Sequence, residues 1–401
     1  MAEAPVNPWL TIIGIGEDGL AGLSEASRNA LEKAETVFGG ERHLKLAAID
    51  GRGKPWPVPF EASCVLSCRG RPTVVLASGD PFWHGAGGSL AAHLEQGEWI
   101  AHPAPSTFSI AAARLGWPLE STVCIALHAA PFERLVPLLA RGGRVICLVR
   151  DASAAAGLAR WLTARGWGAS RLWTLSALGG PREAICESRA DGYKAESAAT
   201  PLAVAVEAKG RTGLPRVSGL ADDLFRHDGQ ITKRPVRALA LSALAPRPGE
   251  RLWDIGAGSG SISIEWALAG GTAIAIEARE DRAANIAANA ADFGLTHRVV
   301  VVTASAPAAL STLEKPDAVF IGGGLDAAMF EGLWLLLAGG TRIVAHAVTL
   351  ETESLLADLQ RRHGGNLLKI EISQAAPLGR LRSWEAVRPV VQWRAVKGAD
   401  A

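Results

Sequence analysis

Short apolar runs alternate with amphipathic stretches along the first half of the chain. Buried strands are predicted where the apolar runs fall, at 9–14, 73–77, 123–127, 144–149, 172–175 and 201–207. Helices are predicted where apolar residues recur at helical spacing, from Ser24 to about Ala34 and over 89–96, 107–115 and 152–165. Strands that alternate with helices favour parallel α/β architecture.

The same alternation resumes after a break rich in glycine and proline. Residues 210–222 are polar and contain three glycines and a proline, which predicts a linker between a domain over 1–209 and a second over 223–401. Beyond the linker, Thr232 is the predicted N-cap of a helix. Strands are predicted at 251–255, 272–277, 298–302, 317–321 and 341–345, with antiparallel strands at 367–374 and 388–396 closing the sheet. Helices are predicted over 261–269, 280–292, from about 326, and over 351–362. This order is typical of a doubly wound, Rossmann-like sheet.

One glycine-rich turn carries the clearest chemical signal. The strand at 251–255 contains Asp254 and leads into glycines 256, 258 and 260, so that the turn reads D-x-G-x-G-x-G before a helix. Such a turn lets the backbone approach a ligand and presents helix N-terminal N–H groups to it. The third glycine of a dinucleotide motif is replaced by Ser261. The next strand ends in Glu277, about 20 residues on, where a carboxylate grips a ribose diol. We therefore predict a nucleoside site, in a pattern that resembles the first motif of S-adenosylmethionine (SAM)-dependent methyltransferases.

Composition narrows the classes of function. Hydrophobic residues make up 48% of the 401 residues and charged ones 20%, which is enough to bury a core in each domain. Lys+Arg number 41 and Asp+Glu 40, so the net charge of +1 gives no electrostatic case for nucleic acid. We also expect no membrane span, because no apolar run reaches about 18 residues, and a cytoplasmic location, because the N-terminus lacks signal-peptide features. The five cysteines are not spaced as metal ligands, and we expect no metal.

Nearly the whole chain resembles the precorrin-6Y C5,15-methyltransferase (decarboxylating) family of aerobic cobalamin biosynthesis, a fusion of two unrelated methyltransferases. In the first half the resemblance rests on Ile12–Leu20, Phe38–His43, Leu76–Phe82 and Pro105–Leu115. It implies a class III tetrapyrrole-methylase domain, two-lobed and α/β, with SAM in the cleft between the lobes. The implied SAM-binding residues are Gly79, Asp80, Ser106 and Thr107, and the loop that contains Gly14 and Gly16 would face the tetrapyrrole. His84 stands where the family usually has an aromatic Tyr.

The second half resembles the decarboxylating methyltransferase of the same pathway, a Rossmann-like class I SAM methyltransferase. The matching stretches are Asp228–Ala238, the Asp254 loop, Asp317–Gly324 and Val344–Glu351. The resemblance implies SAM contacts along the glycine turn and at the ends of neighbouring strands, from Thr232, Asp254, Gly256, Ala257, Gly258, Ser259, Gly260, Glu277, Ser305 and Ala306.

Candidate reacting and substrate-binding residues follow from the chemistry. Methyl transfer from SAM depends mostly on positioning, and no protein nucleophile is needed. The substrate carries many carboxylates, which arginine recognises well. We assign assistance in the reaction to His346, Lys233 and Arg234, and substrate contact to Arg237, Gly322, Gly323, Arg380 and Arg382. For any one of these cations taken alone, a solvated surface charge is the commoner explanation, and a lone histidine is usually structural.

Three functional hypotheses remain open from the sequence. In the first, which assigns ring positions to the two halves as the resemblance implies, a bifunctional enzyme with two SAM sites methylates C5 in its N-terminal half. Its C-terminal half decarboxylates the C12 acetate and methylates C15, giving precorrin-8. In the second, the chain is an RNA methyltransferase with an accessory binding domain. In the third, the N-terminal half only holds the tetrapyrrole. We expect a small-molecule tetrapyrrole partner, no nucleic acid, no membrane and a homo-oligomer.

Overall fold

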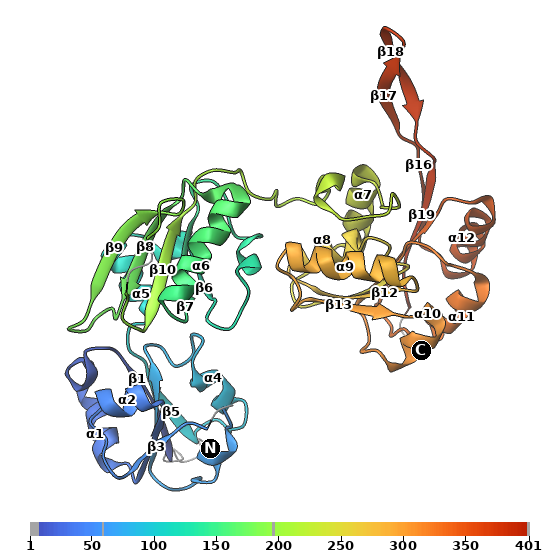
Figure 1. The fold of residues 1–401 in the computed structure, drawn as a ribbon. Helices are drawn as coiled ribbons and strands as arrows, with labels where there is room; N and C mark the ends of the chain where they lie inside the picture. Colours follow the sequence, from blue (N-terminus) through green and yellow to red (C-terminus); the bar gives the residue numbers. More distant parts are fainter. Residues whose placement is uncertain (1–7, 58–59, 195–196, 399–401) are drawn as a thin grey trace. The chain divides into compact units, whose positions relative to one another are not determined.

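A computed structural model describes residues 8–57, 60–194 and 197–398 of the chain (Figure 1). Contacts divide the chain into two compact units. The first comprises Met1–Phe132 with Leu138–Thr212, and the second comprises Gly213–Ala401 with Glu133–Pro137.

The first unit begins with a five-stranded parallel sheet in the order β3-β2-β4-β1-β5. Its strands are β1 (Leu10–Ile15), β2 (Thr36–Gly39), β3 (Gly53–Pro55), β4 (Thr73–Ser78) and β5 (Trp99–His102). The helices around it are α1 (Glu25–Lys33), α2 (Glu41–Leu46), α3 (Ser63–Leu66) and α4 (Ala86–Ala91). Successive side chains of β1 enter opposite cores, Ile13 one and Ile12 the other, so this strand is buried on both faces.

A second five-stranded sheet completes the first unit, in the order β6-β7-β10-β8-β9. Its strands are β6 (Thr122–Ala126), β7 (Arg144–Val149), β8 (Arg171–Ser176), β9 (Ala184–Arg189) and β10 (Leu202–Glu207). It packs with α5 (Thr107–Leu115) and α6 (Ala152–Leu162), and α6 continues as a π-helical turn at Thr163–Trp167. Of the neighbouring strand pairs that the structure describes in this sheet, only β6 and β7 are parallel, so the sheet is mixed rather than parallel as predicted. Apolar runs alone carry no information on strand direction.

Element boundaries in the first unit follow local signals where these are strong. Ser24 caps α1 through a bond from the Ser27 N–H to its hydroxyl, as predicted, and α5 has its predicted bounds. Strands β2, β3, β5 and β9 were not predicted. The first three span at most four residues each, and β9 is mostly exposed. A short or exposed strand gives a weak periodic signal.

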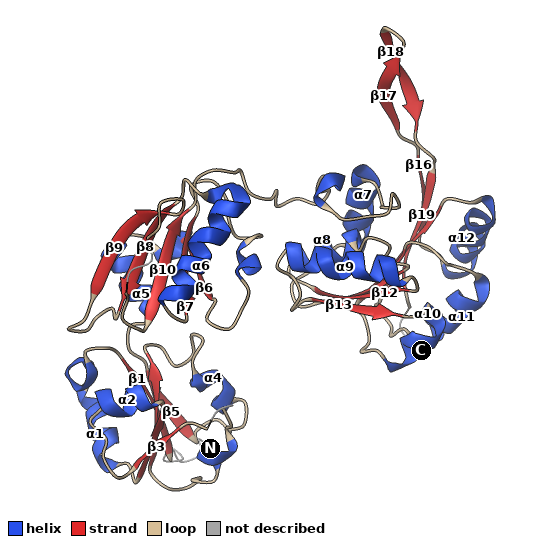
Figure 2. Cartoon of the chain, in the orientation of Figure 1, coloured by secondary structure: helices blue, strands red, loops and turns tan. Residues whose placement is uncertain are grey.

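The second unit is a seven-stranded, doubly wound sheet in the order β13-β12-β11-β14-β15-β19-β16 (Figure 2). The strands are β11 (Arg251–Ile255), β12 (Thr272–Glu277), β13 (Val299–Thr303), β14 (Ala318–Ile321), β15 (Arg342–Ala347), β16 (Asn366–Ile370) and β19 (Val390–Val396). The helices are α7 (Arg234–Leu244), α8 (Ser261–Leu268), α9 (Glu280–Asp292), α10 (Ala306–Ala309), α11 (Ala327–Leu336) and α12 (Leu350–His363). The first five strands along the chain are parallel, and β16 and β19 run antiparallel.

Alternating side chains of the central strands bury the two faces of this sheet. Leu252 packs with α7, α8 and α9, whereas its neighbour Trp253 packs on the opposite face with α11 and α12. The strand order reverses between β11 and β14, and open α/β sheets bind ligands at such a switch point, beyond the carboxyl ends of the strands. The predicted fold class, a two-lobed α/β unit followed by a Rossmann-like unit, is confirmed.

Three features of the second unit differ from the sequence predictions. The segment around Arg380, between the two predicted antiparallel strands, is a hairpin of β17 (Ser373–Leu378) and β18 (Leu381–Ala386), which projects from the body of the unit (Figure 1). The helix predicted to be capped by Thr232 begins at Arg234, with Lys233 at its N-cap. The later part of the predicted linker packs on the sheet, because Leu220 lies in the core cluster. Among the described residues, no helix is long and apolar enough to cross a membrane.

Candidate active site

The glycine turn of the second unit joins the carboxyl end of β11 to the start of α8. Gly256 has a φ of 66°, and a Cβ there would lie 2.8 Å from the carbonyl oxygen of Gly323, in the turn that follows β14. Only glycine permits both the backbone angle and this approach. The N–H groups of Gly256 and Ala257 donate to the Ile276 carbonyl, and Gly260 precedes α8 at its N-cap. The structure therefore brings Gly256 and Gly323 together at the switch point.

Asp254 is buried beneath this turn with one carboxylate oxygen unused. Its Oδ2 accepts hydrogen bonds from the Ser263 N–H at 3.1 Å and the Ser263 hydroxyl at 2.6 Å. Its Oδ1 is buried and has no partner among the described residues. Burial raises the pKa of Asp254 from 3.8 to about 6, and the charge of Glu277 acts in the same direction against the Ser263 hydrogen bonds. A buried carboxylate oxygen without a donor is costly, so this atom suits a ligand that donates to it.

Glu277 ends β12 and is also buried, and its two oxygens hold the turn. Its Oε2 accepts from the Gly258 N–H at 2.9 Å, and its Oε1 accepts from the Arg279 N–H at 3.0 Å. A carboxylate has about four acceptor positions, so each oxygen can accept one further hydrogen bond. This arrangement can receive the two hydroxyls of a ribose without losing the bonds that shape the turn.

A strap formed by residues 226–233 runs beside the glycine turn and is fastened at several points. The Gln230 carbonyl oxygen lies near Gly258. The Arg282 guanidinium on α9 donates to Asp228 at 2.8 Å. Asn289, fully buried on α9, exchanges two hydrogen bonds with the backbone of Arg226 and also donates to the Ser259 carbonyl at 2.9 Å. Asn289 therefore links the strap directly to the glycine turn.

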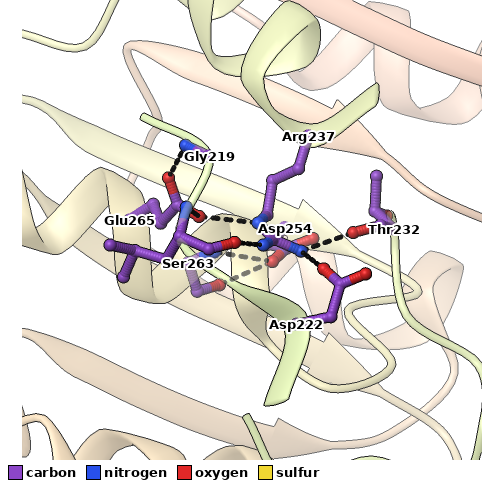
Figure 3. A network of polar contacts seen from close by, with 8 residues as sticks. Gly219, Asp222, Thr232, Arg237, Asp254, Ser263 and Glu265 are labelled. Atoms are coloured by element: carbon purple, nitrogen blue, oxygen red, sulfur yellow. Dashed lines mark hydrogen bonds and ion pairs between the residues drawn. The ribbon is translucent and has the colours of Figure 1, made fainter. Parts of the chain in front are cut away.

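Arg237 forms the centre of the polar network in Figure 3. Its fully buried guanidinium donates to Glu265 at 2.6 Å, to Asp222 at 3.0 Å and to the Thr232 carbonyl at 2.5 Å. It also donates to the Leu220 carbonyl. The prediction of Arg237 as a substrate contact is therefore corrected, because its donors are occupied inside the protein and it holds the strap in place.

The other predicted residues of the second unit occupy varied positions. Lys233 and Arg234 are exposed at the start of α7, and Thr232 is half-buried in the strap. Ser305 is exposed before α10, where the neighbouring Ala304 N–H donates to the Glu277 carbonyl, and half-buried Ala306 begins that helix. Ser259 is buried in the turn.

His346 lies near the carboxyl end of β15 but is enclosed by protein. Its Nε2 lies 3.0 Å from the Gln392 Oε1 on β19, and its ring meets that of Phe320 edge to face. Burial lowers the pKa of His346, which the hydrogen bond to Gln392 offsets only in part. His346 is only 8% exposed and its Nε2 is already engaged with Gln392, and its role in proton transfer stays a prediction.

Gly322, Arg380 and Arg382 separate into two locations. The Gly322 N–H donates to the Ile255 carbonyl, so the turn after β14 lies against the glycine turn. Arg380 and Arg382 are exposed on the β17–β18 hairpin, which leaves the body of the unit in Figure 1. The described contacts do not join these arginines to the glycine turn.

The first unit gathers its predicted residues at the carboxyl ends of β1 and β4. A Cβ on Gly14 would lie 1.8 Å from the Gly79 carbonyl oxygen, so these backbones touch. Gly79 in turn lies against the backbone of Ser106. The hydroxyl of Ser106 accepts from the Ser109 N–H as the N-cap of α5, which leaves Thr107 as the first residue of that helix. The Asp80 carboxylate accepts from the Phe82 N–H, and Gly16 closes a turn with Gly19. This edge resembles a backbone-lined ligand site.

Sequence reasoning missed Ser263 and Asn289, which shape the second site through Asp254 and Ser259. Ser263 was detectable, because it lies on the first turn of the helix that follows the glycine motif. Asn289 was not, because its partners lie 30 and 63 residues away along the chain. Within the parts of the chain that the structure describes, no group of three metal-ligating side chains occurs.

Comparisons with known proteins match each unit to a different family. Residues 9–192 match the family described as Tetrapyrrole (Corrin/Porphyrin) Methylases. Residues 223–397 match the family described as Precorrin methyltransferase domain.

Curated relatives match over the full length or over one part. A protein from Sinorhizobium sp., named Precorrin-6Y C(5,15)-methyltransferase [decarboxylating], is 47% identical over 98% of both chains. A protein of the same name from Mycobacterium tuberculosis is 39% identical over 97% of this chain and 100% of its own. A protein from Saccharolobus solfataricus is named Probable cobalt-precorrin-6B C(15)-methyltransferase (decarboxylating). It is 40% identical over 34% of this chain and 72% of its own.

Proposed function

The chain belongs to the precorrin-6Y C5,15-methyltransferase (decarboxylating) family, and from this premise we propose a separate reaction for each of its units. The protein is a SAM-dependent methyltransferase that acts on a precorrin of cobalamin biosynthesis and removes a carboxyl group. We assign C5 methylation to the first unit, and decarboxylation of the C12 acetate with C15 methylation to the second. The product is then precorrin-8.

Two comparisons support this division. The two families matched are different, which favours two independent methyl-transfer sites. A shorter relative carries a name that refers to C15 and decarboxylation alone and matches about a third of this chain. The alternative of an RNA methyltransferase is not retained, because full-length relatives carry the precorrin name.

The main support for the second site is the Oδ1 of Asp254, which is buried beneath the glycine turn and has no hydrogen-bond partner among the described residues. Together with the free acceptor positions of Glu277, it fits a ligand with several donors, and the residues present therefore fit SAM. Asp254 and Glu277 would hold it, with Thr232, the turn from Gly256 to Gly260, and the backbone around Ser305 and Ala306 completing the pocket. When bound, SAM supplies an electrophilic methyl group on a sulfonium centre.

The chain contributes positioning and charge in this mechanism. The strap fixes Lys233 and Arg234 at the start of α7, where their cations can hold carboxylates of the macrocycle. Gly322 and Gly323 leave room for the ring beside the glycine turn. Each methylation of a ring carbon releases one proton and the decarboxylation takes one up, so exposed groups and water can exchange these protons without a buried base.

In the first unit we propose Gly79, Asp80, Ser106 and Thr107 for SAM, with the turn of Gly14 and Gly16 next to the tetrapyrrole. Because the Ser106 hydroxyl caps α5, its contribution would come through the helix N-terminus rather than a free side chain. Arg380 and Arg382 remain proposed substrate contacts at the hairpin. A cytoplasmic location and a homo-oligomer also remain predictions.

The test is mass spectrometry of precorrin-6B incubated with the intact protein and SAM. We expect a gain of two methyl groups and a loss of carbon dioxide. An unchanged tetrapyrrole mass with folded protein would refute the function. Calorimetric titration of the intact chain should give two SAM molecules per chain. A single one, abolished by Glu277→Ala, would mean that the first unit only holds the tetrapyrrole.

A further inference from the structure

A cluster of charged side chains lies at the carboxyl edge of the first sheet and was not predicted from the sequence. Glu17 follows the turn after β1, Arg42 lies on α2, and Arg182 lies between β8 and β9 of the second sheet. Arg42 donates to one carboxylate oxygen of Glu17, and Arg182 donates to the other at 2.9 Å. One carboxylate thus joins two guanidinium groups, one on α2 beside the first sheet and one in the connection between two strands of the second sheet.

The exposure of these three groups is uneven. The Glu17 side chain is 5% exposed, whereas that of Arg42 is 33% exposed and that of Arg182 is 58% exposed. The two arginines share the Glu17 carboxylate, with one guanidinium on each of its oxygens. Among the described residues, the recorded bonds of Arg182 use only its Nη2, toward Glu17 and the Thr200 carbonyl. Because the Arg182 side chain is 58% exposed, part of its guanidinium group is open to solvent.

Besides Glu17, two neutral side chains contact Arg42. Its Nη2 donates to the Ser78 hydroxyl at 2.7 Å and lies 2.8 Å from the His43 Nε2. Burial, followed by the charge of Arg42, lowers the pKa of His43 to about 4. His43 is therefore a neutral acceptor at physiological pH, and it does not cancel or add to the charge of the arginines.

The cluster adjoins the residues proposed to bind SAM in this unit. Ser78 directly precedes Gly79, and the Gly79 N–H donates to the Ile15 carbonyl, two residues before Glu17. The arginines and the backbone-lined site therefore share one edge of the sheet. Arg182 thus pairs with a buried carboxylate while most of its own side chain stays exposed at this edge.

We propose that Arg42 and Arg182, joined by Glu17, form a clamp for one carboxylate of the macrocycle during C5 methylation. This inference rests on the function proposed for the first unit. A guanidinium fork binds a carboxylate through two parallel hydrogen bonds, and Glu17 fixes both forks before the substrate arrives. The acetate and propionate side chains of a precorrin supply the required group.

The experiment uses the intact chain with precorrin-6B and SAM, and compares wild type with Arg182→Gln and Arg182→Lys. Arg189→Gln is the matched control, because Arg189 is an exposed arginine paired with Asp191. We expect Arg182→Gln to raise the KM for tetrapyrrole in C5 methylation about 10- to 100-fold, the range for loss of a charge-assisted hydrogen bond. The KM of Arg182→Lys should lie between those of the wild type and Arg182→Gln, because lysine keeps the positive charge but lacks the planar guanidinium. The C15 methylation measured in the same samples should not change.

Two results would overturn the clamp: a C5 KM for Arg182→Gln equal to that of the Arg189→Gln control, or a change confined to the affinity for SAM. Failure of the proposed function itself would look different, as wild-type protein that adds no methyl group. In that case the calorimetric Kd of precorrin-6B still decides the clamp, since Arg182→Gln must weaken binding without any turnover.

Discussion

Replacing Asp254 with asparagine tests the electrostatic state of the second site. The folded protein raises the pKa of this carboxyl from 3.8 to about 6, chiefly by burial. Between those values the folded state binds a proton that the unfolded chain does not, so the protonated acid favours folding at low pH. As the pH rises through about 6, this contribution is lost, and the ionised carboxylate makes the second unit less stable.

The magnitude follows from the two pKa values. Their difference, at about 1.4 kcal/mol per pKa unit, corresponds to about 3 kcal/mol. Relative to Asp254→Asn, which does not titrate, the wild-type protein should therefore lose about 2 kcal/mol of unfolding free energy between pH 4 and pH 7.5, because at pH 4 the unfolded carboxyl is already more than half ionised. Because only the pH dependence is compared, a constant effect of the asparagine amide cancels.

The assay is urea denaturation across this pH range, with pulse hydrogen-exchange labelling of the β11 peptide so that only the second unit is reported. Ser188→Ala in the first unit is a suitable control for an unrelated substitution. The affinity for SAM should depend on pH in the opposite sense to stability. In calorimetry, the wild-type protein should bind SAM more weakly at pH values below about 6, where Asp254 gains its proton. Parallel stability curves for wild type and Asp254→Asn would refute the argument, because they would mean that Asp254 has an ordinary pKa.

Three further predictions address other parts of the structure. Glu277→Ala should remove SAM binding from the second unit and leave a singly methylated product in mass spectrometry; a doubly methylated product would contradict the ribose role. Arg237→Met should destabilise the second unit by about 3–5 kcal/mol in urea denaturation, because Glu265 stays buried without its cation, and adding Glu265→Gln should restore part of the loss. The unfolding free energy of the first unit should fall by about 1–3 kcal/mol as the pH falls from 6.5 toward 4, because unfolding lets His43 take up a proton that the fold excludes. The same dependence of stability on pH in His43→Gln would contradict this.

The sequence predicted the parts of the fold that depend on local patterns. The strand, turn and helix around Asp254 were predicted almost to the residue, because apolar runs, glycines and caps act over a few positions. The direction of strands in the second sheet and the hairpin at 373–386 were not, since both depend on which distant segment pairs with which. The apolar pattern of a strand is the same whether the strand beside it is parallel or antiparallel.

The candidate site shows the same division. The Asp254 and Glu277 carboxylates follow directly from their places at strand ends. Arg237 was wrongly assigned to substrate binding. Its place near a cofactor motif does not reveal that it pairs in the core with Glu265, 28 residues later in the chain. Glu17 and Arg182 are 165 residues apart, and only the fold brings them together.

The network around Arg237 also determines where the second unit can be separated from the chain. The matched family begins at residue 223, but Leu220 and Asp222 already bind Arg237, and the N–H groups of Gly219 and Leu220 satisfy Glu265. A fragment cut at 223 would expose a core surface and remove two of the hydrogen-bond donors to the buried Glu265 carboxylate, so it should express poorly. A fragment that starts at Gly213 keeps these anchors and is the sensible choice for producing this half alone.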